Sequence, residues 1–336
     1  MMAPSTRSPA AILRALLFFI PWLLHLILAN ILLTLTLPFS WPFPAQIYAA
    51  NSQIAYTVWA HIQRCFERGR GAKITVSGDA LPRGENAIVI ANHVSWTDFY
   101  LVQALAVRAG MLGSSRYFAK ASLRWVPFLG WGMIALGMPM VSRNWVNDRR
   151  EFEALFEGIK SAALPIWLIA YSEGTRFTQK KWEETKTFCE SRGKPVFPHV
   201  LYPRSKGFVT EVQNLRDSSS HINHVYDLTL AYSKAGGSGV NKGFMDAPTI
   251  WETFAMARVS PPWRFHVHVR RFEIKELPED EEGLRTWLEE RWAEKSRILQ
   301  GMEGSGRSLE GWGRWRAWFD GMGRDYLRSL RIRLKL

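Results

Sequence analysis

An apolar run near the amino terminus places the strongest constraint on how this chain can fold. Residues 15–37 are almost entirely aliphatic or aromatic, with His25, Asn30 and two threonines as polar interruptions. A helix of about 23 residues spans about 35 Å, enough to cross the hydrocarbon core of a bilayer. A cleaved signal peptide is the alternative, but the run is long and prolines follow it in place of a small-residue cleavage site. We therefore expect a retained membrane helix.

A second helix is predicted after the proline-rich break. Residues 45–68 carry apolar side chains at helical spacing, with polar side chains on the other faces and arginines at the end. Arginines also precede the first apolar run. Because basic residues favour the cytoplasmic side of a membrane, these two basic ends predict a hairpin that enters and leaves on one side. We interpret residues 1–70 as a membrane anchor, either a single helix or a helical hairpin.

The charge of the chain narrows the class of its partners. Lys and Arg number 43 against 30 Asp and Glu, a formal net charge of +13. Such an excess suits nucleic acid, an acidic membrane surface or phosphorylated small molecules. The 16 tryptophans favour the membrane, because indole rings collect at the water–lipid interface. No nucleic-acid-binding module is recognisable, so we expect no nucleic-acid partner. Two cysteines exclude a disulfide framework and a zinc-ligand set.

Between residues 71 and 300, apolar runs with the length of strands alternate with helical patterns. This alternation predicts an α/β domain with a largely parallel sheet flanked by helices. Functional residues in such domains gather at the carboxyl ends of the strands. The polar residues that follow apolar runs here are His93, Arg143 and Glu173. The predicted strands lie at residues 73–77, 87–91, 165–171, 225–232 and 265–269.

The carboxyl-terminal tail has a composition of its own. Residues 301–306 are glycine-rich and predict a linker. Aromatic and aliphatic side chains then recur every three or four residues up to residue 336, among many arginines. A basic amphipathic helix in an anionic lipid interface is one interpretation. A helix docked on the domain, with solvated arginines, is the other, and the pattern does not separate them.

The first motif that can carry chemistry follows the strand predicted at residues 87–91. It reads Asn92-His93-Val94-Ser95-Trp96-Thr97-Asp98, where the chain turns from a strand end into a helix. Asp98 can hold one ring nitrogen of His93 protonated and leave the other free to accept a proton from a hydroxyl. On this spacing alone, a hydrogen-bonded structural histidine is the more common outcome.

The second motif, Glu173-Gly174-Thr175-Arg176, directly follows the strand predicted at residues 165–171. Gly174 permits a tight turn, Thr175 offers a hydroxyl, and the planar guanidinium of Arg176 matches a phosphate. A surface ion pair explains such a tetrapeptide equally well when it stands alone. Two motifs that each follow a buried strand favour one shared site.

Together the two motifs resemble those of the glycerolipid acyltransferases of the lysophosphatidic acid acyltransferase kind, in their eukaryotic membrane-bound subgroup. The resemblance extends over about residues 73–272 and includes the segments at residues 125–132 and 201–208. The sequence departs from the family pattern at Tyr171-Ser172, where the family usually has Phe-Pro.

The resemblance implies transfer of a fatty acyl group from acyl-CoA, as co-substrate, to a hydroxyl of a lysophospholipid or glycerol-phosphate acceptor. It implies no metal and no cofactor, and a membrane protein of the endoplasmic reticulum with its active site towards the cytoplasm. Lysophosphatidic acid and lysophosphatidylinositol are both open as acceptors. A non-catalytic membrane lipid-binding or scaffold protein is the alternative.

The resemblance also assigns roles to individual residues. His93 is expected to be the general base, and Asp98 to orient and charge it. The remaining motif residues are expected to bind the acceptor phosphate. They are Glu173, Gly174, Thr175 and Arg176, with Arg143 and Lys120 as further phosphate partners.

Two other pairs of residues are weaker candidates. His266 and His268 alternate with apolar residues on a predicted strand, which favours a polar strand face over a metal site. Arg204 and Lys206 are either at the rim of a phosphate site or simply solvated.

Overall fold

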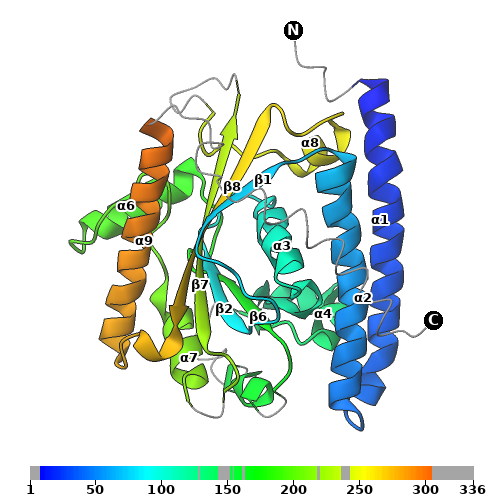
Figure 1. The fold of residues 1–336 in the computed structure, drawn as a ribbon, viewed down its shortest axis with the longest axis horizontal. Helices are drawn as coiled ribbons and strands as arrows, with labels where there is room; N and C mark the ends of the chain where they lie inside the picture. The colour runs from blue at the N-terminus through cyan, green and yellow to red at the C-terminus, as the bar shows by residue number, and fades with distance from the viewer. Residues whose placement is uncertain are drawn as a thin grey trace.

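The computed structural model describes residues 8–127, 129–142, 152–153, 155–160, 163–217, 220–235 and 243–304. At its centre lies a six-stranded sheet with the strand order β1–β8–β7–β2–β6–β3 (Figure 1). Only the β7–β8 pair is antiparallel among these neighbours, and the other pairs are parallel. The largely parallel α/β sheet predicted from the sequence is confirmed. Its strands are β1 Ile74–Gly78, β2 Ala87–Ala91, β3 Ser115–Tyr117, β6 Trp167–Tyr171, β7 His224–Lys234 and β8 Trp263–Glu273.

Helices cover both faces of the sheet. α3 (Asp98–Arg108) and α8 (Ile250–Ala255) lie on the right-hand face in Figure 1, with α1 and α2 outside them. The left-hand side carries α6 (Gln179–Glu190), α7 (Ser205–Leu215) and α9 (Glu281–Gly304).

The central strand β2 shows why both faces need cover. All five of its residues are buried. Ala87, Val89 and Ala91 belong to the hydrophobic cluster on the α3 side, whereas Ile88 and Ile90 belong to the cluster with α7 and α9. This division follows from the two-residue period of a strand, and a parallel strand with two apolar faces requires helices on each.

The predicted hairpin is formed by α1 (Pro9–Thr36) and α2 (Pro44–Arg64), which lie side by side in Figure 1. α1 begins before the predicted residue 15, because the Ser8 side chain caps it and Pro9 suits its first position. Of the helices that the structure describes, one is long and apolar enough to cross a membrane. It is the segment Pro9–Ser40, with a mean hydropathy of 2.3.

The hairpin shares its core with the sheet. Ala11, Ala15 and Trp22 of α1 belong to the same hydrophobic cluster as Val89 and Val267 of the sheet. The predicted division at residue 70 therefore does not separate two hydrophobic cores.

Residues 129–142, which contain the apolar run before residue 143, are not one continuous strand. They form α4 (Leu129–Ala135), a turn, and the short strand β5 (Met140–Val141), which pairs with β4 (Ala119–Lys120). The turn includes Gly137 at a φ of +66°, a conformation that interrupts an apolar run.

The linker predicted at residues 301–306 is wrong for its first part, because α9 continues through Gly304. Met302 is buried in the core, and the Glu303 carboxylate lies 3.0 Å from Nε2 of His199. These contacts outweigh the low helix propensity of glycine. The rest of the predicted tail lies outside the described residues.

Candidate active site

His93 is held at the carboxyl end of β2 by its neighbour Asn92. The buried Asn92 amide donates to Leu230 O (3.0 Å) and accepts from Leu230 N (2.7 Å), so it ties the end of β2 to β7. The carbonyl of His93 accepts a hydrogen bond from Phe177 N (2.7 Å). Phe177 directly follows the second motif, so the two predicted motifs meet at this strand end.

The predicted His93–Asp98 pair is formed. Nδ1 of His93 lies 2.7 Å from Oδ2 of Asp98, the first residue of α3. The same oxygen accepts from Val94 N (2.7 Å) and Ser95 N (3.1 Å), and Oδ1 accepts from the Tyr232 hydroxyl (2.5 Å). A carboxylate at a helix amino terminus is also stabilised by the helix dipole. The surroundings of Asp98 thus provide a donor for each oxygen of its carboxyl group, although its side chain is only 1% exposed.

The other side of the His93 ring is open. Its side chain is 22% exposed, and Nε2 has no hydrogen-bond partner among the residues that the structure describes. The ring stacks on Tyr171, with centroids 4.1 Å apart and planes inclined by 16°. One ring nitrogen is therefore fixed by a carboxylate and the other is free, which is the arrangement a general base needs.

The second motif forms a tight turn after β6. Gly174 has a φ of +68° and donates to Tyr171 O (2.9 Å), so this position requires glycine. A Cβ atom at Gly174 would meet Cδ of Arg204 at 3.0 Å, and Arg204 N donates to Ser172 O (2.7 Å). The sequence left two positions open for Arg204, the rim of a phosphate site or bulk solvent. In the structure, its backbone and side chain lie against the second motif.

Cationic side chains on this turn face solvent. Arg176 and Arg204 are exposed, and Thr175 is half-buried. Neither arginine forms an ion pair with a carboxylate within the described ranges. Lys120, at the end of β4, is also exposed, and no hydrogen bond or ion pair among the described residues joins it to either motif. Arg143 lies outside the described residues. The turn therefore presents two guanidinium groups that an anion can pair with.

Glu173 points inward rather than towards solvent. It is 2% exposed and accepts a hydrogen bond from Nε1 of Trp292 (3.3 Å) on α9. Burial raises the pKa of Glu173 well above its ordinary value, opposed by the Trp292 indole and the backbone of His93. This geometry differs from the expected contact with the acceptor, since the carboxyl group lies in the wall of the site.

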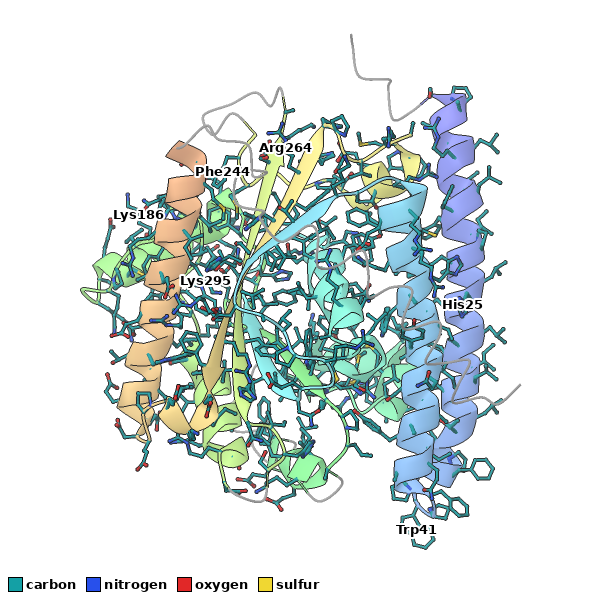
Figure 2. The ribbon with its side chains drawn as sticks, in the orientation of Figure 1. His25, Trp41, Lys186, Phe244, Arg264 and Lys295 are labelled. Carbon is teal, nitrogen blue, oxygen red and sulfur yellow. The ribbon has the colours of Figure 1, made fainter. Side chains whose placement is uncertain are left out.

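An ion pair lies beside Glu173 in the same wall. Nζ of Lys295 pairs with Asp227 and also donates to Leu228 O (2.6 Å), and both charged side chains are buried. Figure 2 shows Lys295 on the side of α9 that faces the sheet. The second motif is thus attached to the carboxyl-terminal helix through buried polar groups.

No cluster of three or more His, Cys, Asp and Glu side chains that could hold a metal ion occurs in the described part of the chain. The rings of His266 and His268 bond to strand hydroxyls instead. His266 contacts Thr75 (2.7 Å) and Ser77 (2.8 Å), and His268 contacts Ser77 (3.0 Å). These contacts agree with the predicted polar strand face.

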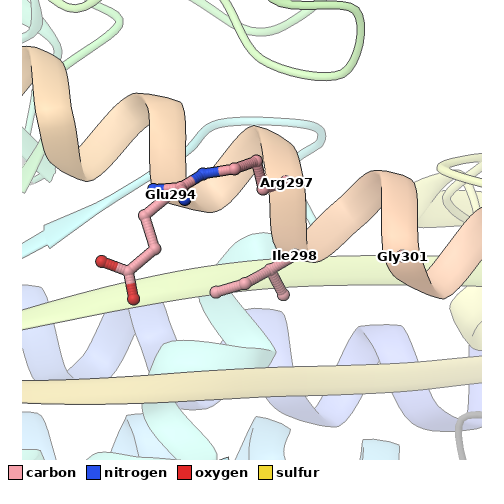
Figure 3. Close-up of a pocket in the computed structure, with 4 residues that line it drawn as sticks. All are labelled: Glu294, Arg297, Ile298 and Gly301. Carbon is pink, nitrogen blue, oxygen red and sulfur yellow. The ribbon is translucent and has the colours of Figure 1, made fainter.

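A depression of about 520 Å³ lies on α9 (Figure 3). None of the residues that line it belongs to the two motifs. They are Glu294, Arg297, Ile298 and Gly301.

Three residues of the site were not predicted from the sequence to have a role in it. Tyr232 belonged only to a predicted strand, Tyr171 stood out only as a departure from a family pattern, and Trp292 lay in neither motif. No signal in the sequence pointed to Tyr232, because its hydroxyl reaches Asp98 only once β7 pairs beside β2. Trp292 had none, because its contact with the second motif spans 119 residues of sequence.

Comparison with known proteins gives consistent results. The Acyltransferase family model matches residues 73–233, and the Acyltransferase C-terminus model matches residues 259–303. The 1-acyl-sn-glycerol-3-phosphate acyltransferase 2 of Brassica napus is 31% identical, over 84% of this chain and 69% of that protein. The lysocardiolipin acyltransferase 1 of Danio rerio is 30% identical, over 68% of this chain and 56% of that protein.

A solved structure also matches. The crystal structure of the 1-acyl-sn-glycerophosphate acyltransferase PlsC from Thermotoga maritima covers 82% of this chain and 96% of its own. The identity is 18% and the TM-score is 0.44. For the two relatives named above and six further curated relatives, the chain spans between 56% and 69% of the relative's length.

Proposed function

Because this chain belongs to the glycerolipid acyltransferase family, we propose that it moves a fatty acyl group from acyl-CoA to a hydroxyl of a lysophospholipid or glycerol-phosphate acceptor. The observation that carries this proposal is the His93–Asp98 pair, with one ring nitrogen fixed and the other open. Relatives named for lysophosphatidic acid and for lysocardiolipin acylation support an acceptor of this class, in phospholipid synthesis or remodelling.

In the proposed reaction, Nε2 of His93 removes the proton from the acceptor hydroxyl as its oxygen attacks the thioester carbonyl. A carbon–oxygen bond forms, the carbon–sulfur bond breaks, and the imidazolium returns the proton to the CoA thiolate. Asp98 keeps the Nδ1 proton in place and stabilises the imidazolium. No covalent acyl-enzyme is required. The bonds on both oxygens of Asp98 support this role, because they fix the carboxylate before substrate binds.

The acceptor phosphate is proposed to bind at the turn of the second motif. Arg176 and Arg204 are exposed and without a carboxylate partner among the described residues, and Thr175 adds a hydroxyl. Two guanidinium groups can neutralise a phosphate and hold the acceptor hydroxyl beside His93, an orientation effect. Glu173 would hold the backbone of His93 by a hydrogen bond from within the wall of the site. Lys120 and Arg143 remain proposed as further phosphate partners.

The membrane is proposed to contact the outer face of α1. This face exposes large aliphatic side chains along the helix, and Trp41 at its tip is 92% exposed (Figure 2). The inner face is attached to the domain near both ends. Arg14 donates to Ala255 O (2.7 Å), and Leu33 packs with Leu136. This attachment supports a chain held at one membrane surface, which we propose to be the cytoplasmic face of the endoplasmic reticulum.

The first test is acyl transfer by the purified full chain. Labelled acyl-CoA is supplied with lysophosphatidic acid, lysophosphatidylinositol, other lysophospholipids or glycerol 3-phosphate, and the products are resolved by mass. We expect transfer to at least one acceptor. His93→Ala should lower kcat by about 10²–10⁴-fold, the usual contribution of a general base. Circular dichroism and the Tm check that the variant is folded.

Two outcomes would contradict the proposal. Near-normal transfer by folded His93→Ala would exclude the general-base mechanism. A wild-type chain that binds lysophospholipid vesicles but transfers no acyl group to any acceptor would favour a non-catalytic lipid-binding protein.

A further inference from the structure

The Asp98 carboxylate is held from two sides, and only one of them belongs to the motif predicted from the sequence. Its Oδ2 accepts from three N–H groups of the motif segment, whereas Oδ1 accepts from the Tyr232 hydroxyl at 2.5 Å. Tyr232 lies on β7, next to β2 in the sheet, and is 0% exposed. It therefore reaches the site from the core and not from the substrate side.

We infer that Tyr232 is a positioning residue for the proposed base, because its hydroxyl sets the rotation of the Asp98 carboxylate and thereby the orientation of His93. This inference rests on the proposed function. Tyr232 acts through Asp98 and does not touch a substrate.

The packing around the Tyr232 ring fixes the position of its hydroxyl. Its ring packs edge-on against Phe265 of β8, with centroids 5.8 Å apart and planes at 84°. Tyr232 and Phe265 are also partners in the β7–β8 register. The hydroxyl of Thr97 lies 3.5 Å from the phenol oxygen. The hairpin of two eleven-residue strands thus fixes the donor that Asp98 meets.

The Tyr232 hydroxyl is the donor that Oδ1 needs. Among the described residues, it is the only side chain that donates to this oxygen. A buried acceptor that loses its donor is destabilised, so without the phenol the carboxylate would rotate to find another donor. Burial and the Asp98 charge raise the pKa of Tyr232 well above its ordinary value of 10. The hydroxyl therefore stays protonated and donating across the neutral pH range.

A matched control lies on the same strand. Tyr226 faces the same hydrophobic cluster as Tyr232, and its hydroxyl donates to the carboxylate of Glu85. Tyr226→Phe and Tyr232→Phe each remove one hydroxyl that is bonded to a carboxylate, but only the second touches Asp98. Both variants are assayed as full chains with acyl-CoA and the acceptor that the wild type uses.

We expect Tyr232→Phe to lower kcat about 10- to 100-fold, with the KM of both substrates within about twofold, since the base is misoriented while the binding surfaces are unchanged. Tyr226→Phe should keep kcat near the wild-type value, whatever its effect on the Tm. Equal kcat values for the two variants, or a Tyr232→Phe effect on KM alone, would overturn the inference.

A double-mutant cycle provides a second measurement that does not depend on one variant. If Tyr232 acts through Asp98, Tyr232→Phe should change kcat little in an Asp98→Asn background. Independent, multiplicative effects would overturn the inference while leaving the proposed function intact. A wild-type chain without acyl transfer would instead remove the proposed function, and this inference with it.

Discussion

The two motifs of the site differ in how many of their polar groups form hydrogen bonds or ion pairs within the protein. Around His93, both oxygens of Asp98 have donors and one ring nitrogen is fixed. Around Gly174, the motif is divided: Glu173 is buried against α9, whereas Arg176 is exposed with no carboxylate partner among the described residues. In the first motif, the closed motif, the Asp98 and His93 side chains are bonded within the protein. The second motif, the open motif, exposes a guanidinium group to solvent.

This difference fits the two roles proposed for the motifs. A general base gains from being fixed before substrate arrives, because reorientation during the reaction raises the barrier. A site for an anion gains from unpaired cations, because an internal ion pair would have to break first. Glu173, the buried residue of the second motif, is neither the base nor one of the cations. It attaches the turn to the carboxyl-terminal helix.

The largest effect in the closed motif, after loss of His93 itself, is expected for Asp98→Asn. The asparagine keeps the shape and can direct its carbonyl oxygen to His93 and its amide to Tyr232. It removes the charge that stabilises the imidazolium, so kcat should fall by up to about 10²–10⁴-fold with little change in KM. Steady-state kinetics on the purified chain measure this. A large increase in acceptor KM with normal kcat would show that Asp98 binds substrate instead.

A smaller effect, on binding rather than turnover, is expected in the open motif. Arg176→Ala removes a guanidinium that can pair with the acceptor phosphate, and a hydrogen bond to a charged group contributes about 1.5–3 kcal/mol. The acceptor KM should therefore rise about 10- to 100-fold, while the acyl-CoA KM and kcat change little.

Arg192→Ala is the control for Arg176→Ala, because it removes the same charge from an exposed position just after α6. Its acceptor KM should stay near the wild-type value. Equal effects of the two variants would indicate a general effect of net charge. An effect of Arg176→Ala on the acyl-CoA KM alone would reassign Arg176 to the donor.

Local patterns predicted much of this architecture. β2 has the predicted bounds at residues 87–91, and the His93–Asp98 contact follows from a spacing of five residues across a strand–helix turn. The burial of Glu173 could not be predicted, because it depends on Trp292, far away in the sequence. The same holds for Tyr232, whose hydroxyl reaches Asp98 only once β7 pairs beside β2.

Packing that the sequence does not show also matters at the two ends of the domain. Glycines at residues 301 and 304 predicted a linker, but burial of Met302 and the contact of Glu303 with His199 continue the helix. The first helix is long and apolar enough for the predicted membrane helix, and its Trp22 also packs against the domain at Phe254. Sequence periodicity shows which face of a helix is apolar, and it does not show whether lipid or protein covers that face.

The smallest effect is expected for Glu173→Gln. This variant tests what the buried carboxyl group of the second motif does. Burial raises the pKa of Glu173 well above its ordinary value of 4.5 and so favours the protonated carboxyl group. Glutamine has nearly the same shape and no charge, and its carbonyl can still accept from Trp292. The kcat of this variant should therefore stay within about threefold of the wild-type value. A much larger loss of kcat would instead indicate that an ionised carboxylate contacts the acceptor.

The pH dependence of stability provides an independent measurement of the same group. An acid whose pKa is raised in the folded state stabilises the fold fully below its unfolded pKa, and this contribution is lost as the pH rises towards the folded value. Glu173→Gln should remove part of that decline in the free energy of unfolding above about pH 4.5.

Glu211 is a matched control, because burial raises its pKa to about 8. Glu211→Gln should flatten the decline between pH 4.5 and 8 in the same way without touching the motif. If Glu173→Gln leaves the slope unchanged while Glu211→Gln flattens it, Glu173 is ionised in the folded protein, and its carboxylate again becomes a candidate for direct contact with the acceptor.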